Sequence, residues 1–491
     1  MDLHVVVLAA GKGTRMKSAQ PKVLHRVAGL PMIDYVLATA AALAPRSTTV
    51  VAGHQADVLR QALAAYPNVD VVLQEPQLGT GHALLQTEPA LRGATGTLVL
   101  LSGDVPLLTV ATLRTLVAHH VASKAAATVL TAVVDDPTGY GRAVRSDAAG
   151  ARSDAAGARS GAAGGQLTRI VEEKDASAAE REIREVNSGI YALALEGDDP
   201  DGPDGLFRAV REIGTENASG EYYLPDLVTV YRRHGRTVSS VSVRNPDEIR
   251  GINSRSDLAI VSRIMRHQKA AELMAAGVTI EDPATAYIDR DVTVGADTVL
   301  HPNVFLEGTT TIGAGCEIHS GTRIVNSQIG DGAIVLNHCV LAGARVGTGA
   351  RIGPFAHLRK DADVRDGARV GNFVELKNTV LGAGSKSMHL AYLGDARIGE
   401  GVNVGAGTIT CNYDGERKQQ TVIKDGAFIG SDSQLIAPVT IGEQAYIGSG
   451  STIRENVPAG ALAVSAGKQR NIDNWVGERK KKRASTSSHK E

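Results

Sequence analysis

The sequence predicts an α/β domain followed by a parallel β-helix. In the first half of the chain, short apolar runs alternate with longer amphipathic stretches, which is typical of a parallel sheet covered by helices on both faces. From Ile288 onward, aliphatic residues recur every six positions. A period of six is neither helical nor that of a coiled coil, but it matches a hexapeptide β-solenoid. We expect domains at 1–255 and 278–478, joined by a linking helix over 256–277, although the alternative that this is the last helix of the first domain remains open.

The expected strands of the first domain are short and strongly apolar. They include HVVVLAA (4–10), VDVVLQ (69–74) and TLVLLSGD (97–104), and stretches with helical spacing such as 110–121 lie between them. Between Arg145 and Gln166 this pattern gives way to tandem copies of SDAAGAR without a large apolar residue. Such a segment cannot form a core, and surface loops tolerate insertions at low cost. We interpret it as an expanded loop.

Hexapeptide spacing continues through most of the second half. Gly often follows the aliphatic residue, as in IGAG, VGTG and IGSG. Two segments interrupt the period, SKSMHLAYLGD (385–395) and TCNYDGERKQQ (410–420). A solenoid has little concave surface of its own, so loops that leave its coils are where a site is expected.

Composition excludes several classes of protein. The formal net charge of -1 argues against a general nucleic-acid binder. Three widely spaced cysteines predict neither a disulfide framework nor a metal cluster. The apolar run at 5–10 is too short for a signal peptide, and no stretch is long enough to span a membrane. We therefore expect a soluble cytoplasmic protein without membrane insertion, and a basic, Ser-rich tail at 479–491 that is disordered.

The densest chemical motif is LAAGKGTRM (8–16), followed by Pro21 and Lys22. Gly11 and Gly13 allow backbone amides to approach a phosphate, and nearby basic side chains add positive charge. The motif lacks the spacing of a Walker loop and the third glycine of a dinucleotide fingerprint. It therefore predicts a phosphate-binding turn of another kind.

These residues, with LGTGHA (78–83), SGDVPLL (102–108), GYGR (139–142), IVEEKDA (170–176), EVNSGIY (185–191) and GIN (251–253), resemble the sugar-phosphate nucleotidyltransferases, which have a Rossmann-like fold. Together with the hexapeptide repeats, nearly the whole chain resembles one family. Its members join an N-acetylglucosamine-1-phosphate uridylyltransferase to a glucosamine-1-phosphate N-acetyltransferase, and the second domain is a left-handed β-helix.

The resemblance implies a first site that binds UTP and N-acetylglucosamine 1-phosphate. Asp104 and Asn253 would hold Mg²⁺, a hard cation that needs few protein oxygens. The other residues implied for this site are Leu8, Ala10, Gly11, Arg15, Lys22, Gln74, Gly79, Thr80, Ser102, Gly103, Gly141, Glu172 and Asn187. For three of these residues an alternative without ligand binding remains open. Asp104 can cap a turn, Lys22 can be a solvated lysine and Glu172 can face solvent.

A second site is implied for transfer of an acetyl group from acetyl-CoA. His389 would be the general base and Glu375 would orient it. Glucosamine 1-phosphate would be bound by Arg359, Lys377, Tyr392 and Asn403, and acetyl-CoA by Ala406, Asn412, Tyr413, Ser431 and Ser449. The chain departs from the family at Ala466, where many relatives carry an Arg that contacts CoA, so the resemblance does not assign the CoA phosphate contacts.

The resemblance therefore implies a bifunctional enzyme, with acetylation first and uridylyl transfer second, that produces UDP-N-acetylglucosamine for the cell wall. It also implies a homotrimer. Two alternatives remain at this stage: a nucleotidyltransferase whose β-helix only regulates or oligomerises, and a non-catalytic scaffold. The set formed by His389, Asn412 and Tyr413 favours the bifunctional enzyme, because a purely structural solenoid does not need it.

Overall fold

The chain forms two compact units, Met1–Gln268 and Lys269–Glu491. The computed structural model describes residues 2–146, 165–196, 205–465 and 467–487. The boundary between the units falls within helix α8 (Arg255–Ala275), which occupies the segment where the sequence predicts a linking helix. The SDAAGAR repeats between 147 and 164 lie outside the described residues.

The first unit is built on a mixed sheet with the strand order β11-β7-β10-β6-β1-β4-β5. Strand β1 runs parallel to both of its neighbours, β4 and β6, whereas β10 is antiparallel to β6. The strands are β1 (Leu3–Ala9), β4 (Ser47–Ala52), β5 (Val69–Leu73), β6 (Thr95–Ser102), β7 (Ala127–Val133), β8 (Arg142–Arg145), β9 (Leu167–Val171), β10 (Glu185–Glu196) and β11 (Val238–Ser242).

Both faces of this sheet are covered. Val5 and Val7 of β1 pack with helices α1 (Met32–Ala41), α2 (Ala56–Leu63) and α4 (Val110–Ser123), whereas Val6 packs on the other side with α3 (Thr80–Leu85), α6 (Leu206–Arg211) and α7 (Leu227–Arg233). Successive side chains of a strand point to opposite faces, so burial on both sides requires the continuous apolar run seen in the sequence.

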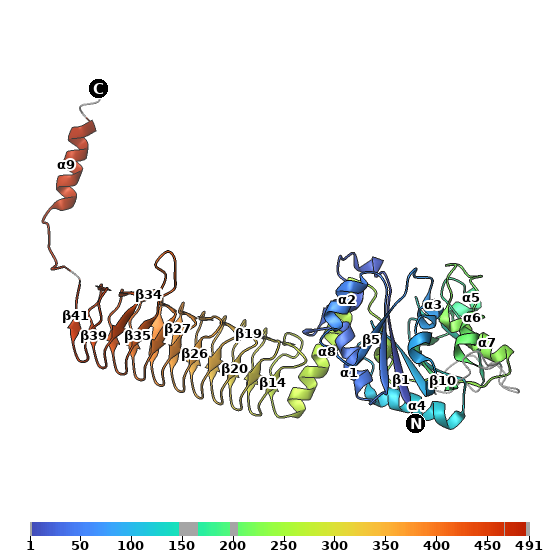
Figure 1. Ribbon diagram of the computed structural model, residues 1–491. Helices are drawn as coiled ribbons and strands as arrows, with labels where there is room; N and C mark the ends of the chain where they lie inside the picture. Colours follow the sequence, from blue (N-terminus) through green and yellow to red (C-terminus); the bar gives the residue numbers. More distant parts are fainter. Residues whose placement is uncertain (1, 147–164, 197–204, 466, 488–491) are drawn as a thin grey trace. The chain divides into compact units, whose positions relative to one another are not determined.

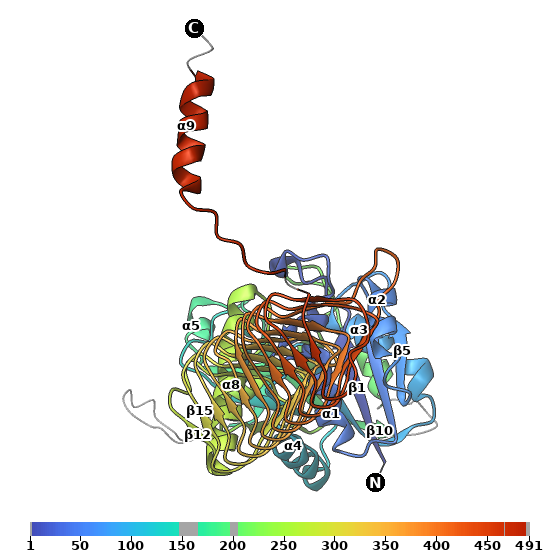
Figure 2. The same ribbon diagram turned by 90° about the vertical axis from the view of Figure 1, so that its left-hand side faces the viewer.

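The second unit is a parallel β-helix whose coils have three faces. We name the faces after their first strands, which are β12 (Thr279–Ile280), β13 (Tyr287–Ile288) and β14 (Thr293–Val294). The β12 face holds eleven strands, the β13 face ten and the β14 face nine, and each strand pairs in parallel with the strand one coil further on. Figure 1 shows the stacked coils of this β-helix from the side, and Figure 2 shows them in a view along the helix axis. The aliphatic residues of the hexapeptides point inward and form one continuous core, for example Leu300, Ile318 and Val335.

The strands that bear on the second site lie in the later coils. They are β25 (His357–Leu358), β27 (Arg369–Asn372), β28 (Glu375–Lys377), β30 (Lys386–His389), β31 (Tyr392–Gly394), β33 (Asn403–Val404), β34 (Ile409–Cys411), β35 (Thr421–Ile423), β36 (Phe428–Ile429), β37 (Gln434–Ile436), β39 (Tyr446–Ile447) and β41 (Leu462–Ala463).

The prediction that 385–395 interrupts the coils of the β-helix is wrong. Strands β30 and β31 continue the coil there, with Ser387 and Leu393 in the buried inward positions. The sequence conceals this coil because a serine replaces an aliphatic residue and because the coil contains 17 residues instead of three full hexapeptides. Of the segment 410–420, Thr410 and Cys411 still belong to β34, and the rest leaves the coil through a loop closed by a bridge between Tyr413 and Lys418, which projects from the stack in Figure 1.

The end of the chain differs from the expected disorder. Helix α9 spans Trp475–Ser487, so residues 479–487 are helical, and 488–491 lie outside the described residues. Lys, Arg and Glu favour helices, and contacts one turn apart support this one: Lys481 pairs with Glu478 at 3.0 Å, and the Arg479 guanidinium lies over the Trp475 ring. Within the parts of the chain that the structure describes, no helix combines the length and apolar character needed to cross a bilayer.

Candidate active sites

A cavity of about 490 Å³ opens at the carboxyl ends of β1 and β6. These two parallel strands are neighbours at the point where the strand order reverses, which is the usual ligand position in open α/β sheets. The predicted residues that line this cavity are Leu8, Ala10, Gly11, Lys22, Gln74, Gly79, Thr80, Ser102 and Asp104. The sheet topology therefore brings together motifs that lie up to about a hundred residues apart.

The glycine-rich turn after β1 has two distinct glycines. A Cβ at Gly11 would meet no atom within 4 Å, so the backbone there stands open to a ligand. Gly13 has a φ of 58°, in the left-handed region, and a Cβ there would lie 2.9 Å from the Cβ of Lys22. Gly13 thus makes room for the stem of Lys22, while Gly11 leaves space above the turn.

Lys22 lies between the two predicted metal ligands. Its ammonium contacts Oδ2 of Asp104 and donates to Oδ1 of Asn253 at 3.1 Å. Two oxygens from distant parts of the chain thus converge on one cationic group, and such hard oxygens are the ligands that Mg²⁺ prefers. Among the described residues no cluster of three or more His, Cys, Asp or Glu is arranged to hold a metal. The oxygen pair of Asp104 and Asn253 fits an ion that takes its other ligands from water and substrate phosphates.

The turn that carries Gly79 forms the opposite wall of the cavity. Nε2 of Gln74 donates to the carbonyl of Gly79 at 2.9 Å. Because a carbonyl can only accept, this contact identifies the NH₂ end of the Gln74 amide and leaves its Oε1 for a ligand donor. The Thr80 hydroxyl accepts from the backbone amide of Leu224 at 3.0 Å. A Cβ at Gly79 would lie 2.6 Å from the Tyr222 carbonyl, so only glycine fits.

Gly141, Glu172 and Asn187 form a second group beside this cavity. A Cβ at Gly141 would lie 2.9 Å from Oε1 of Glu172, and the Asn187 amide donates to the Gly141 carbonyl at 2.8 Å. Gly189 links the group to the cavity, because a Cβ there would lie 4.0 Å from the Ser102 hydroxyl. Burial, together with the carboxylates of Asp226 and Asp175, raises the pKa of Glu172.

The side-chain amide of Asn187 has a fixed orientation. Its Oδ1 accepts from the Gly189 backbone amide at 3.0 Å and from the buried Tyr191 hydroxyl at 3.1 Å. A backbone N–H can only donate, so the atom that faces it must be the oxygen. Asn187 therefore offers its NH₂ end to a ligand. Tyr191 is not among the predicted site residues, although it stands at the end of the EVNSGIY motif.

A buried arginine holds the adjacent glycine loop. Arg142 is 1 % exposed, pairs with Glu173 at 2.6 Å and donates to the Tyr140 carbonyl. Glu173 also accepts from the amide of Gly139 at 3.3 Å. Arg142 and Glu173 thus hold the GYGR loop in place, and neither residue was predicted to have this role.

Like Asn253 and the group of Gly141, Glu172 and Asn187, the predicted residues Arg15 and Gly103 do not line the cavity. Arg15 is exposed on the turn. Gly103 is a packing residue, since its amide donates to the Leu8 carbonyl at 2.9 Å and a Cβ would lie 3.2 Å from Ile33. It keeps β1 and β6 close enough for Ser102 and Asp104 to face the cavity.

In the second unit, His389 lies at the corner between the β12 and β13 faces. Its Nδ1 is 2.8 Å from Oδ1 of Asn372, the residue opposite it in the parallel pairing of β27 and β30. Glu375, the predicted orienting residue, instead forms an ion pair with Arg359 at 2.9 Å. The described residues show no hydrogen bond between Glu375 and His389. The contact that the sequence assigned to Glu375 is therefore made by Asn372, which the sequence analysis missed.

Cationic side chains gather on the β13 face beside this corner. The cationic Lys377 is the last residue of β28. In the same strand, Glu375 lies opposite Tyr392 of the adjacent strand. The nearby Lys377 lowers the pKa of Lys418, which comes from the projecting loop. Lys418 is thus a further cation that the sequence analysis did not predict. Asn403 lies apart from this group, on the β12 face between Lys386 and Phe428.

The predicted acetyl-CoA residues continue the row that contains His389. Gly407 donates to the carbonyl of Leu390, Asp432 to that of Ala406 and Gly450 to that of Ser431, so Ala406, Ser431 and Ser449 occupy the same corner in successive coils. At about 4.8 Å per coil, the row extends roughly 14 Å from His389. Ala466 lies outside the described residues.

The projecting loop carries the other two predicted acetyl-CoA residues. Asn412 is largely buried and its amide donates to Asp395, so its side chain is engaged within the protein. Tyr413 is 62 % exposed, and its hydroxyl donates to the Gly415 carbonyl at 2.5 Å. Of the two, Tyr413 offers its ring to a ligand.

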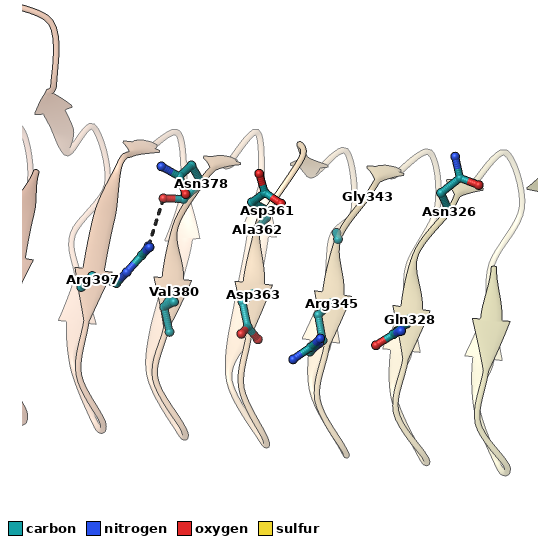
Figure 3. Close-up of a pocket in the computed structure, with 11 residues that line it drawn as sticks. Asn326, Gln328, Gly343, Arg345, Asp361, Ala362, Asp363, Asn378, Val380 and Arg397 are labelled. Carbon is teal, nitrogen blue, oxygen red and sulfur yellow. Dashed lines mark hydrogen bonds between the residues drawn. The ribbon is translucent and has the colours of Figure 1, made fainter. Parts of the chain in front are cut away.

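A shallow hollow also lies on the β14 face. Gln328, Arg345, Asp363, Val380 and Arg397 follow one another on successive coils there, as Figure 3 shows. None of the predicted site residues lines it. Its chemistry is that of a polar outer face of the β-helix, and it is separate from the His389 corner.

Comparison with known proteins agrees with both halves of the chain. Residues 5–169 match the model of the MobA-like NTP transferase domain, and residues 420–455 match that of the bacterial transferase hexapeptide (six repeats). The "Bifunctional protein GlmU" of Pelobacter propionicus is 44% identical over 98% of this chain and 99% of its own length. The chain belongs to the GlmU family. GlmU proteins of Trichlorobacter lovleyi and Shouchella clausii are each 46% identical over 96% of this chain, and cover 97% and 98% of their own lengths.

Membership of the GlmU family confirms the expected fold, a nucleotidyltransferase domain followed by a left-handed β-helix of hexapeptide repeats. It also confirms the bifunctional enzyme of UDP-N-acetylglucosamine biosynthesis, with a UTP- and Mg²⁺-dependent uridylyltransferase and an acetyltransferase that uses acetyl-CoA. The alternatives of a purely regulatory β-helix and of a non-catalytic scaffold are thereby excluded.

Proposed function

We propose that the cavity beside β1 and β6 is the uridylyltransferase site. The observation that carries this assignment is the convergence of Asp104, Asn253 and Lys22 beside the open backbone of Gly11. An oxygen of the sugar 1-phosphate attacks the α-phosphorus of UTP, a new P–O bond forms, and the bond to pyrophosphate breaks. Such transfers depend on alignment and charge neutralisation more than on covalent help from the protein.

The residues of this site have separate roles. Asp104 and Asn253 would hold Mg²⁺, which would neutralise charge on the triphosphate when bound, while Lys22 stabilises the charge that develops on the phosphates. Oε1 of Gln74 accepts the N3 hydrogen of uracil, with Gly79 and Thr80 beside it. Gly141, Glu172 and Asn187 bind the N-acetylglucosamine part. Gly103 acts by packing, and Arg15 contributes positive charge at the entrance.

The corner of the β-helix at His389 is the acetyltransferase site. The amine of glucosamine 1-phosphate attacks the thioester carbonyl of acetyl-CoA while Nε2 of His389 accepts a proton from the amine nitrogen. A C–N bond forms, the C–S bond breaks, and the proton passes to the departing CoA thiolate. Arg359, Lys377 and Lys418 face the sugar phosphate, and the row of Ala406, Ser431 and Ser449 has small side chains that leave room for the pantetheine arm.

This site is open in a single chain, which supports a homotrimer. Phe373 and Leu390, the residues that follow Asn372 and His389, are 56 % and 63 % exposed. Enclosure of a long cosubstrate needs more wall than one narrow prism offers. A neighbouring subunit at this corner would cover the apolar side chains and complete the CoA channel, where Asn403 of the β12 face also contributes.

The enzyme works in the cytoplasm. Cys316, Cys339 and Cys411 are all free thiols, as expected for a reducing compartment, and both UTP and acetyl-CoA are made inside the cell. The acetylated product of the second site is the acceptor of the first site, which orders the two reactions.

The proposal is tested by supplying purified protein with glucosamine 1-phosphate, acetyl-CoA, UTP and Mg²⁺. Thiol release should precede pyrophosphate release, and omission of acetyl-CoA should abolish both. Addition of N-acetylglucosamine 1-phosphate should then restore pyrophosphate release alone. Pyrophosphate release from glucosamine 1-phosphate without acetyl-CoA would contradict the order.

A further inference from the structure

Asn372 and His389 are brought together by the backbone of two successive coils. They are direct partners in the parallel pairing of β27 and β30, and the Leu390 amide donates to the Asn372 carbonyl at 3.0 Å. A Cβ at Gly371 would lie 1.9 Å from the Met388 carbonyl, so only glycine allows the coils to approach this closely. The contact between Oδ1 of Asn372 and Nδ1 of His389 is therefore built into the stack.

The residues that directly follow Asn372 and His389 in the chain have the same backbone conformation. Phe373 and Leu390 have φ values of 57° and 45°, so each coil turns the corner in the left-handed region directly after the polar residue. Non-glycine residues rarely adopt this conformation, and here it occurs at the same corner in consecutive coils. The corner thus directs Asn372 and His389 outward side by side.

We propose that Asn372 is the positioning residue of the general base His389, a role that rests on the proposed acetyltransferase function of this corner. A neutral imidazole has one N–H and one free lone pair. Oδ1 of Asn372 accepts the hydrogen of Nδ1, which selects the tautomer whose lone pair is on Nε2. That nitrogen is then free to accept the proton of the attacking amine.

An amide in this position has a different effect from a carboxylate. Both can accept the Nδ1 hydrogen, but a carboxylate also stabilises the imidazolium and keeps the base protonated to higher pH. Asn372 orients the ring without adding negative charge. Glu375 is a carboxylate of the adjacent β13 face, and its charge is matched by Arg359.

Other charged groups surround this corner and contribute to the pH dependence of thiol release. Arg369 and Lys386 are outward residues of the strands that carry Asn372 and His389, on the β12 face. On the β13 face, His357 lies beside Glu375 and Tyr392 in adjacent strands. All of these stay unchanged when residue 372 alone is replaced, so a comparison of variants at that position isolates its effect.

The test measures thiol release from acetyl-CoA with glucosamine 1-phosphate as a function of pH. N372A should lower kcat about 10- to 100-fold with small changes in both KM values, because the ring loses its orientation. N372D retains an acceptor and should keep most of the plateau kcat, but the acidic limb of the kcat/KM profile should move up by about one pH unit. Circular dichroism and thermal unfolding show whether each variant is folded.

Two control variants show whether the effect belongs to position 372 alone. N337D places the same charge at the equivalent corner, about 14 Å along the stack from His389, beyond the range of effective interaction at physiological salt, so its profile should not move. E375Q should leave the acidic limb in place. An unchanged kcat in N372A together with an unchanged profile in N372D would overturn the proposal, as would a downward shift of the limb in E375Q alone. Absence of thiol release by the wild-type enzyme would instead refute the acetyltransferase assignment.

Discussion

The ammonium of Lys22 donates a hydrogen bond to Oδ1 of Asn253 at 3.1 Å, although 231 residues separate the two in the chain. The same ammonium contacts Asp104. One lysine thus pairs with the Asp104 carboxylate and occupies the amide oxygen of Asn253, so it would have to give up both contacts before these oxygens could bind Mg²⁺.

Replacement of Lys22 tests this competition. K22M should bind Mn²⁺ several-fold more tightly in the absence of nucleotide, because no ammonium competes for the two oxygens, while pyrophosphate release should fall roughly 100-fold. Calorimetric titration with Mn²⁺ measures the first effect. K12M is the matched control, since Lys12 lines the same cavity without contact to either oxygen. If Mn²⁺ binds K22M no better than the wild-type enzyme, the competition does not exist.

The two glycines of the turn should respond differently to alanine. G13A must accommodate a left-handed φ and a Cβ 2.9 Å from Lys22, so it should lose about 1–2 kcal/mol of stability and much of its turnover. G11A meets no atom within 4 Å and should keep its Tm, but its methyl group occupies the space of a phosphate and should raise the KM for UTP. Equal Tm values for the two variants would contradict this distinction.

Tyr191 should affect the sugar and not the nucleotide. Y191F removes one of the two donors that orient Asn187, so the KM for N-acetylglucosamine 1-phosphate should rise roughly 2- to 10-fold, the usual effect of one net hydrogen bond. The KM for UTP should stay constant. Y35F is the control, because it removes another buried hydroxyl, which donates to the Val27 carbonyl at 2.8 Å. A similar rise of the sugar KM in Y35F would show a general loss of stability instead.

Glu172 and Glu173 should have opposite effects on stability at neutral pH. Burial raises the folded-state pKa of Glu172, so its carboxylate destabilises the fold above that pKa and has no such effect below the unfolded-state value of about 4.3. E172Q should therefore raise Tm at pH 8 and not at pH 4, at the expense of sugar binding.

The carboxylate of Glu173 has the opposite effect and stabilises the fold. The hydrogen bond from Arg142 lowers the pKa of Glu173, so its contribution to stability is present above the unfolded-state pKa and is lost as the pH falls through the folded-state value. E173Q should lower Tm at pH 8. Differential scanning calorimetry of both variants at the two pH values checks the signs, and a shift in the same direction for both would contradict them.

Much of the fold was predictable because burial imposes a period. Inward positions such as Ile318 and Leu341 are aliphatic in most hexapeptides, and the central strands of the first unit are apolar since both faces of the sheet are covered. The motif residues Gln74 and Asp104 could also be assigned to one cavity, because the carboxyl ends of parallel strands meet at one edge of a sheet.

The contact between Asn372 and His389 could not be predicted by counting hexapeptides along the sequence. Three full hexapeptides would place Gly371 opposite His389, but the coil contains 17 residues, which brings Asn372 there instead. Shortened coils leave no clear mark in the sequence when a serine such as Ser387 occupies the inward position. The role of Tyr191 was missed for a similar reason, since a buried aromatic residue in a strand is also what packing alone requires.

The two active sites of this chain should work independently of each other, and a paired assay of two variants shows whether they do. Pyrophosphate release from UTP and thiol release from acetyl-CoA are measured on the same preparations of D104A and H389A. D104A should lose pyrophosphate release by at least about 100-fold and retain thiol release, and H389A should show the reverse. Loss of both activities in either folded variant would contradict the division between the two units.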